Sequence, residues 1–403
     1  MTVSFELPDD VRKVSDEVRD WSLHQVRPLA REGDRSKSLP AGADAVMANC
    51  PVDLSPLAIA TFGRTHGDWG HEFPLNGFTT NYVLGAAVSE AIGYGDSWPL
   101  ATLRGSIAEK AILALGTPEQ QGRWVGGFMR GEFRSSAFAL TEPHFGSDAS
   151  QVATTAIRTS DGWVIRGSKM YCSLGAGADY TVVFATVDKE LGRHGIRAFV
   201  VTRDTPGYVV TKAREDKLGM RAFETSALSF DDMHVPSDAL LGSEDQDSRG
   251  FYAALGTLNT SRPLTAAWAV GIASGSVDYL EQWTRQHGRA FAVERRRRID
   301  EDILRMKAGL AEARRLYLRA AALQDKGVDN RREASAAKAY APQIAEAACR
   351  RVAEIMGPDG TSERHLIEKW CRDIRIFDIW EGSGQIQRLT ISRMLMGSGA
   401  GRA

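Results

Sequence analysis

The sequence predicts a mainly α-helical fold with a β domain in its middle, because the spacing of apolar residues changes twice along the chain. Apolar side chains recur at helical intervals in the first third and again after residue 242. Between these zones, short β-branched and aromatic runs alternate with turn residues, which is typical of strands. The 403 residues suffice for two or three packed domains. We expect a helical domain at 1–132, a β domain at 133–242 and a helical bundle at 243–403.

The N-terminal zone should open with a helix near Pro8, where Asp9 and Asp10 suit the positive end of the helix dipole. Pro28 should end or bend this helix, because proline lacks the backbone N–H that a helix interior needs. The Gly-, Trp- and His-rich stretch 63–77 is expected to be a loop. Further helices are expected at 82–92, at 107–115 and after Thr117, which suits a helix cap.

The middle and C-terminal zones differ in the spacing of their apolar residues. In the middle zone, strands are expected on both sides of the hairpin turn Asp161-Gly162 and further along the chain, at 154–158, 163–166, 181–187, 197–201, 208–212 and 227–230. In the last zone, helices are expected at 248–286, 300–326, 332–356, 362–373, 375–380 and 384–396, with breaks at 327–329 and 357–360.

Composition excludes several classes of function. Lys and Arg total 50 against 51 Asp and Glu, so no overall positive charge attracts nucleic acid or an anionic membrane. The four cysteines are far apart and form no CxxC pair, which argues against a zinc site, and we expect no metal. No run of about 18 apolar residues is present, and the first residues do not resemble a secretory signal. We therefore expect a cytoplasmic enzyme.

The first candidate functional segment is FALTEPHFGSD at 138–148. Its Pro, Gly, Ser and Asp residues are common in any loop that follows a strand. Alternatively, the Thr141 hydroxyl and the open backbone at Gly146 would form a cradle for a planar heterocycle and its phosphates. Taken alone, the segment leaves both interpretations open.

Two further segments carry candidates. In GSKMYCS at 167–173, Tyr171 and Ser173 would share one face of a strand and suit a flavin ring, although an ordinary half-buried strand explains the pattern better when it is taken alone. In IWEGSGQIQR at 379–388, Glu381 lies before a Gly-rich turn that should open a helix. It is either a helix cap or a catalytic carboxylate.

Together, TEPHFGSD, GSKMYCS and EGSGQIQ, in this order and spacing, strongly resemble the acyl-CoA dehydrogenase family. The segment KLGMR at 217–221 agrees, and the resemblance spans nearly the whole chain, most weakly at 35–80. It implies an N-terminal helical domain, a central β-barrel-like domain and a C-terminal four-helix bundle.

The resemblance implies a flavoenzyme of lipid metabolism that contains FAD and converts an acyl-CoA to the trans-2-enoyl-CoA. Glu381 would take the α-proton while a hydride passes to flavin N5, and electrons would leave to an electron-transfer flavoprotein. The implied FAD contacts are Phe138, Leu140, Thr141, Gly146, Ser147, Tyr171, Ser173, Ser383 and Gln385. The implied substrate contacts are Ser147, Asn259, Arg262, Trp380 and Gly382, with Leu103, Arg104 and Ser106 near the acyl pocket. For Arg262, a salt bridge on the helix surface is the alternative.

The sequence departs from the family pattern where FAD of a neighbouring subunit would bind. Arg289 and Phe291 are separated by one residue fewer than in the family pattern, and the Gly that usually follows the Phe is missing. Glu354, three residues before Gly357, stands where Gln is common. We retain these four residues as cofactor contacts within a homo-oligomer (dimer or homotetramer), with a heteromer as the alternative. The charged run 294–298 would be a solvated face, or would meet FAD phosphates or a partner. Asn259 and Trp380 replace the usual Asp and Tyr, and the acyl group stays undefined.

Two other functions stay open at this point. The chain would be an O2-using sister flavoenzyme such as an acyl-CoA oxidase, because oxygen access leaves no mark in the sequence. It would otherwise be a flavin-poor subunit that scaffolds a catalytic partner, as the altered 289–291 and 354–357 patches suggest.

Overall fold

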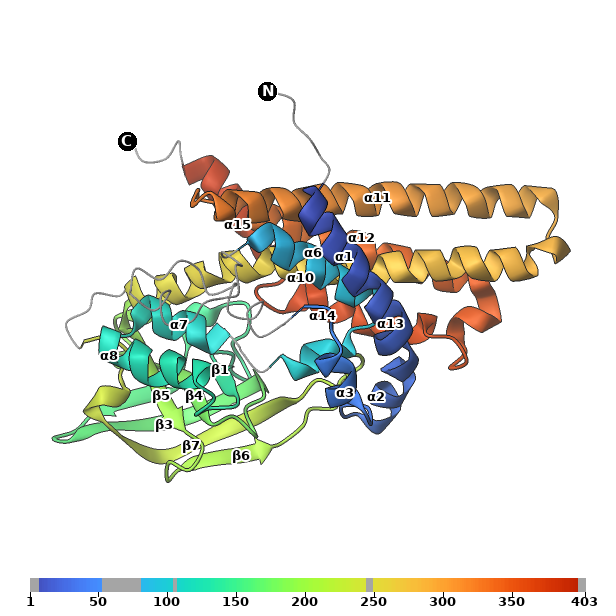
Figure 1. The fold of residues 1–403 in the computed structure, drawn as a ribbon. Helices are drawn as coiled ribbons and strands as arrows, with labels where there is room; N and C mark the ends of the chain where they lie inside the picture. The colour runs from blue at the N-terminus through green and yellow to red at the C-terminus, as the bar shows by residue number, and fades with distance from the viewer. Residues whose placement is uncertain (1–6, 53–80, 104–106, 244–248, 398–403) are drawn as a thin grey trace.

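A computed structural model describes residues 7–52, 81–103, 107–243 and 249–397. Helices form both ends of this path and a single curved sheet forms its middle (Figure 1). The long helices of the last third lie side by side above and beside the sheet, and the N-terminal helices cross them. The expected fold class, mainly helical with a β middle, is confirmed.

The N-terminal helical path continues through Pro28 instead of ending there. After the first helix, a π-helical turn and a 3₁₀ turn that contains Pro28 lead directly into the next helix. A change to a 3₁₀ turn accommodates Pro28, since proline is tolerated at the start of a helical turn. The elements are α1 (Asp9–Trp21), η1 (Ser22–Val26), η2 (Arg27–Leu29), α2 (Ala30–Ser36), α3 (Ala43–Ala48), α6 (Tyr82–Gly95), η3 (Trp98–Thr102), α7 (Ile107–Leu115), α8 (Pro118–Gln121), η4 (Gly122–Gly126) and α9 (Gly127–Met129).

The sheet has seven strands: β1 (Ser136–Ala139), β2 (Thr155–Arg158), β3 (Gly162–Ser173), β4 (Tyr180–Thr186), β5 (Ile196–Thr202), β6 (Tyr208–Lys212) and β7 (Thr225–Pro236). Short 3₁₀ turns lie at Ala149–Gln151, Gly192–Gly195 and Ser237–Ala239. The strand order is β1-β4-β2-β3-β7-β6, and β5 pairs antiparallel along the whole length of β4. The expected β2–β3 hairpin forms with Arg158 opposite Trp163. β1 runs parallel to β4, whereas β3 and β7 are long antiparallel partners.

The C-terminal part contains α10 (Arg249–His287), η8 (Gly288–Ala290), α11 (Val293–Asp325), α12 (Arg331–Met356), η9 (Gly357–Thr361), α13 (Ile367–Asp373), α14 (Arg375–Ile379) and α15 (Gly384–Gly397). α11 begins before the expected residue 300, so the charged run 294–298 forms its first turns. These five side chains are exposed, as a solvated helix face requires.

Buried apolar side chains form separate cores in the helical part of the molecule and around the sheet. One core joins the N-terminal helices to the C-terminal bundle through residues such as Trp21, Ala269 and Trp370. Another lies between α7 and the sheet, with Ile112 and Tyr180 among its members. Because α7 also packs against α10, it lies where sheet and bundle meet.

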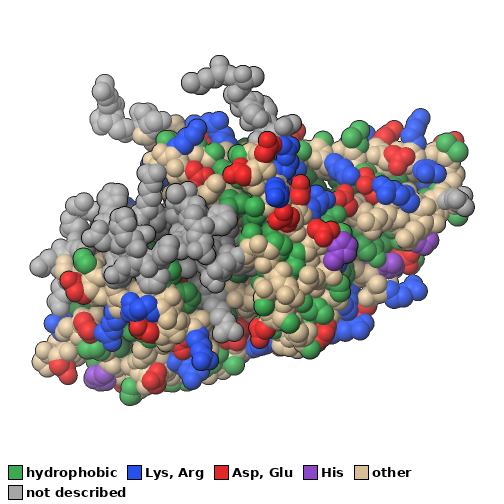
Figure 2. Space-filling view, viewed as in Figure 1, with side chains coloured by type: hydrophobic (Ala, Val, Ile, Leu, Met, Phe, Trp, Pro, Cys, Tyr) green, Lys and Arg blue, Asp and Glu red, His purple; other side chains and the backbone are tan. Residues whose placement is uncertain are grey.

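A buried ion cluster fastens the N-terminal helices to the bundle. Lys369 Nζ donates to both oxygens of Asp96 at 2.8 Å and to Asp373 Oδ2 at 2.5 Å. The two carboxylates raise the pKa of this buried lysine. On the face shown in Figure 2, acidic and basic side chains are interspersed over the described helices.

Candidate active site

Glu381 lies in a tight turn between α14 and α15, with its backbone in the left-handed region. Its φ is 56°, and that of Gly382 is 87°. This conformation costs a non-glycine residue about 1 kcal/mol or more, so it persists only where neighbours hold it. The Glu381 carbonyl accepts hydrogen bonds from Arg262 Nε and Gln387 Nε2, both at 3.2 Å. The Gly382 carbonyl accepts from Gln387 Nε2 at 3.0 Å and from Lys338 Nζ at 3.3 Å. Side chains from three helices therefore hold the turn.

The Glu381 carboxylate does not cap α15. Its Oε2 accepts a hydrogen bond from Ser261 Oγ at 2.9 Å, across from α10. The cap of α15 is Ser383, whose Oγ accepts from the backbone N–H of Ile386 at 3.4 Å. Within the described part of the chain, Glu381 Oε1 has no hydrogen-bond donor. One carboxylate oxygen is therefore anchored and the other remains available.

Arg262 and Asn259 contact each other. Arg262 Nη1 donates to Asn259 Oδ1 at 2.7 Å, while Nε holds the Glu381 carbonyl. Burial lowers the pKa of the Arg262 guanidinium, and the nearby Glu381 raises it. Arg262 makes no ion pair with any described carboxylate, so the structure does not bear out the alternative of a surface salt bridge. Arg262 ties α10 to the Glu381 turn.

Two buried lysines flank this turn, and the sequence patterns did not single them out. Lys338 on α12 is fully buried, and Lys110 on α7 is 5% exposed. Burial lowers the pKa of each ammonium, and the nearby Glu381 opposes this effect. The effect of burial is the larger, so each pKa is lowered to about 8. Lys110 Nζ donates to Thr260 Oγ1 at 2.9 Å, on the residue before Ser261. Ser261 was missed for the same reason: no local signal marks a side chain whose partner comes from another helix.

Trp380 packs among aromatic rings beside the Glu381 turn. Its ring centroid lies 5.2 Å from that of Phe377 and 6.1 Å from that of Phe223, both nearly edge-on. Its indole Nε1 is buried and has no acceptor among the described residues. The larger indole therefore fills space between α14 and the segment before β7.

The first two candidate segments lie side by side. The backbone N–H of Met170 donates to the Thr141 carbonyl at 2.8 Å, and Lys169 Nζ donates to the Leu140 carbonyl at 3.0 Å. Lys169 Nζ also pairs with the Glu142 carboxylate at 2.8 Å, and this cation lowers the pKa of Glu142 against the effect of burial. Phe138 packs on Phe184 with ring centroids 4.9 Å apart. The conspicuous Glu142 is therefore a structural residue.

The strand that carries Tyr171 and Ser173 is interrupted by a bulge. The register of β3 against β7 shifts between Lys169 and Cys172, and Tyr171 has φ 57°. The expectation that Tyr171 and Ser173 share one face of a regular strand is therefore wrong in its geometry. Tyr171 is 57% exposed, whereas Ser173 is half-buried. The bulge turns the Tyr171 ring outward beside the Thr141 segment.

The third segment reaches the first two through residues 220–224. The backbone N–H of Leu174, next to Ser173, donates to the Glu224 carbonyl at 3.3 Å. The adjoining Phe223 contacts Trp380, the neighbour of Glu381. The structure thus connects all three segments across the junction of sheet and bundle.

The residues expected to meet FAD of a neighbouring subunit form a separate group. Phe291 packs on Trp283 at 5.7 Å between ring centroids, and Trp283 Nε1 donates to Asp359 Oδ2 at 3.0 Å, two residues after Gly357. Glu354 is exposed and pairs with Arg351 at 2.9 Å. The backbone of Arg289 lies in the turn η8. None of these contacts reaches Glu381 or the side chains that hold its turn.

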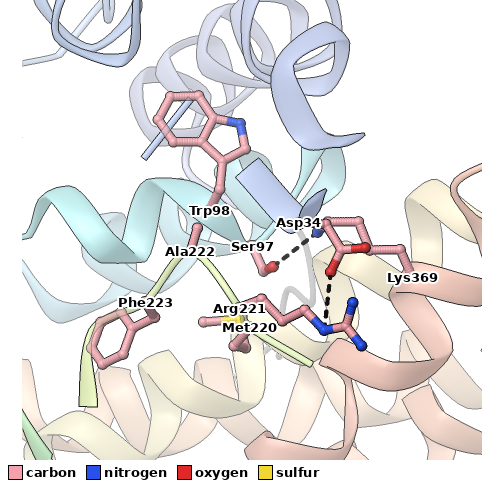
Figure 3. Close-up of a pocket in the computed structure, with 8 residues that line it drawn as sticks. All are labelled: Asp34, Ser97, Trp98, Met220, Arg221, Ala222, Phe223 and Lys369. Atoms are coloured by element: carbon pink, nitrogen blue, oxygen red, sulfur yellow. Dashed lines mark hydrogen bonds and ion pairs between the residues drawn. The ribbon is translucent and has the colours of Figure 1, made fainter. Parts of the chain in front are cut away.

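A small cavity has Phe223 in its wall. Its other lining residues are Asp34, Ser97, Trp98, Met220, Arg221, Ala222 and Lys369 (Figure 3). Its volume is about 10 Å³, close to the room of one water molecule. Asp34 faces Arg221 across it, and Ser97 faces Lys369 (Figure 3). Charged side chains of the structural ion pairs form part of its wall, and it is too small for an acyl chain. Arg104, Ser106 and the stretch 63–77 lie outside the described residues.

Comparison with known proteins defines the class. Residues 137–233 match the model of the acyl-CoA dehydrogenase middle domain, and residues 248–396 match that of the C-terminal domain. The chain is 36% identical to an acyl-CoA dehydrogenase of Bacillus subtilis, over 94% of this chain and 96% of that protein. It is 33% identical to the mitochondrial short-chain specific acyl-CoA dehydrogenase of Bos taurus, over 98% and 92%. The structure of butyryl-CoA dehydrogenase from Megasphaera elsdenii superposes with a TM-score of 0.82 at 26% identity, covering 98% of this chain and 100% of that one.

The chain belongs to the acyl-CoA dehydrogenase family. It is a flavoenzyme that uses FAD to dehydrogenate an acyl-CoA, and the alternative of an oxidase is not favoured. The residues present fit the cofactor. A Cβ built on Gly146 would meet only Thr141 Cγ2, at 3.9 Å, so the backbone there is open to a phosphate. The exposed Tyr171 ring leaves a face for stacking. Among the described helices, none is long and apolar enough to cross a bilayer.

Proposed function

We propose that Glu381 is the catalytic base that removes the α-proton of a bound acyl-CoA. The anchoring of one carboxylate oxygen by Ser261, with the other left available, carries this proposal. A general base must be held within hydrogen-bond reach of the proton that it takes. The turn held by Arg262, Gln387 and Lys338 supplies that rigidity.

In the proposed step, the α-C–H bond breaks and its proton passes to Glu381 Oε1. The electron pair left at the α-carbon forms the new double bond as hydride leaves the β-carbon, which yields the trans-2-enoyl-CoA. Bound FAD supplies the two-electron acceptor for that hydride. The backbone N–H of Glu381 has no acceptor among the described residues, so it is free to stabilise the charge that develops on the thioester oxygen.

The neighbouring residues have proposed roles that follow the family pattern. FAD would be held by Phe138, Leu140, Thr141, Gly146, Ser147, Tyr171, Ser173, Ser383 and Gln385, and FAD of a neighbouring subunit by Arg289, Phe291, Glu354 and Gly357. The substrate would meet Ser147, Asn259, Arg262, Trp380 and Gly382. Trp380, wedged between Phe377 and Phe223, would limit the length of the acyl group. This agrees with the short-chain specificity named for the bovine relative.

The cellular setting is also a proposal. We infer a cytoplasmic enzyme of lipid metabolism that works as a homo-oligomer, dimer or tetramer, and passes electrons to an electron-transfer flavoprotein. Family membership supports these assignments.

Anaerobic titration of the purified flavoprotein with a panel of short acyl-CoAs tests the function. We expect the visible absorbance of the oxidised flavin to bleach with short acyl-CoAs and to be unaffected by free CoA. Rapid recolouring in air would instead support the oxidase. Protein that lacks FAD, or that no acyl-CoA bleaches, would contradict the proposed function.

A further inference from the structure

Lys110 is a buried cation that the proposed mechanism does not use. It lies on α7 between the fully buried Ala108 and Ala111, and only 5% of its surface is exposed. Burial of a charge is unfavourable unless the charge is paired, so a lysine at such a position ordinarily has a carboxylate partner. The buried Lys169, for example, pairs with the Glu142 carboxylate at 2.8 Å. Lys110 makes no ion pair with a described carboxylate.

The hydrogen-bonding capacity of Lys110 is incompletely used. An ammonium group has three N–H donors. Among the described residues, its single hydrogen-bond partner is Thr260 Oγ1, at 2.9 Å. The neighbouring Glu109 accepts a hydrogen bond from Tyr180 Oη at 2.7 Å, on the sheet side of α7. Two donors of Lys110 therefore remain for another group.

Lys110 lies next to the site where the acyl group reacts. Its partner Thr260 directly precedes Ser261, whose hydroxyl holds the Glu381 carboxylate, and adjacent Cα atoms are about 3.8 Å apart. Glu381 is also the largest favourable electrostatic influence on Lys110. Lys110 thus approaches the reacting region from α7, whereas Lys338 approaches it from α12 and already donates to the Gly382 carbonyl.

The alternative partner for Lys110 is Glu381 itself. A direct pair would hold the base in its charged form and weaken it as a proton acceptor. This pair is not formed among the described residues: Ser261 donates to Glu381 Oε2, and Lys110 donates to Thr260 Oγ1. An anion carried by the substrate would take the remaining donors of Lys110 and leave Glu381 available.

We propose that Lys110 selects an acyl group that carries a carboxylate at the end remote from the thioester. This inference rests on the proposed function and names its substrate class, a short dicarboxylic acyl-CoA. Charge-assisted hydrogen bonds to the two remaining N–H donors would orient the acyl chain, with its α- and β-carbons between Glu381 and the flavin.

Selectivity measurements on the holoenzyme test the proposal. The probes are glutaryl-CoA and its ω-methyl ester, which differ in charge and little in length, with succinyl- and adipyl-CoA to vary the reach. The observable is the ratio of kcat/KM for the acid to that for the ester. We expect the wild type to favour the acid by about 10- to 100-fold, the range that corresponds to a charged hydrogen bond.

Variants of Lys110 test whether this lysine causes the preference for the acid over the ester. Lys110→Met, which keeps the length of the side chain and removes the charge, should abolish the acid preference, whereas Lys110→Arg should retain most of it. Lys13→Met on the exposed face of α1 is the matched control and should leave the ratio unchanged.

Three results would overturn the inference. A wild-type enzyme that prefers the ester would overturn it, and this result needs no variant, so it holds even if Lys110→Met fails to fold. An acid preference that persists in Lys110→Met would place the selecting group elsewhere. In both cases bleaching by acyl-CoAs still supports the proposed function, whereas failure of every acyl-CoA, acid or ester, overturns both proposals.

Discussion

Two regions of the C-terminal bundle satisfy their charged side chains in opposite ways. Around Glu381, polar contacts are partly buried, and each joins the turn to another helix: Ser261 to the carboxylate, and Arg262 and Lys338 to the backbone of the turn. Around Glu354, the side chains are exposed, with Arg351 and Glu354 46% and 52% accessible. Exposed ion pairs contribute only about 0–1 kcal/mol, because solvent screens them.

The contrast separates a region built for positional precision from one built as a solvated surface. A left-handed glutamate needs several donors to hold it, and the three donor side chains are at most half exposed. The Arg-rich start of α11 needs no such support, because the side chains of 294–298 are all exposed to solvent. Substitutions in the two regions should therefore differ in effect.

The largest effect among the supporting residues is expected at Ser261. Replacement by Ala removes the hydrogen bond that orients the Glu381 carboxylate, and a hydrogen bond to a charged group is worth about 1.5–3 kcal/mol. We expect the rate of flavin reduction by acyl-CoA to fall by about 10- to 100-fold, with FAD content unchanged. Ser261→Thr, which keeps the hydroxyl, should recover most of the rate in the same stopped-flow measurement.

A pH-dependent stability effect is expected at Lys338. Its pKa in the folded protein is about 8, below the ordinary value of 10.5. Between these values the unfolded chain binds more protons than the folded one, so the free energy of unfolding rises with pH. Relative to Lys338→Met, the wild type should gain on the order of 2 kcal/mol between pH 8 and pH 10.

Urea unfolding of the two proteins at several pH values measures this difference. Comparison with the Lys338→Met variant cancels the contributions of Lys110 and Lys217, whose pKa values are also lowered to about 8. A difference that stays constant from pH 8 to pH 10 would show that Lys338 is not desolvated in the folded protein.

The smallest effect is expected in the exposed region. Glu354→Gln replaces an acceptor-only group by an amide that also donates, which FAD of a neighbouring subunit would use. We expect FAD to bind a few-fold more tightly, consistent with about 0.5–1.5 kcal/mol for one neutral hydrogen bond. Flavin fluorescence on titration of the apoprotein gives the dissociation constant. An unchanged constant would mean that this region does not meet the cofactor.

Local sequence patterns predicted the elements and the Glu381 segment, because helix and strand periods and turn residues act over a few positions. They failed where the outcome depends on packing. The bulge at Tyr171 depends on how β3 pairs with β7. Ser261, Lys110 and Lys338 acquire their roles only because α10, α7 and α12 meet at Glu381.

Glu381 is the central residue of the proposed reaction, and Glu381→Gln tests its role as the base with little change of side-chain shape. The measurement is the single-turnover rate of flavin reduction by an acyl-CoA without oxygen, with the exposed Glu363→Gln as a matched control. We predict that Glu381→Gln retains FAD and that its rate falls by about 10²–10⁴-fold, the usual contribution of a general base. The control should reduce its flavin at the wild-type rate. Reduction in Glu381→Gln within tenfold of the wild type would contradict the account and assign proton removal to another group.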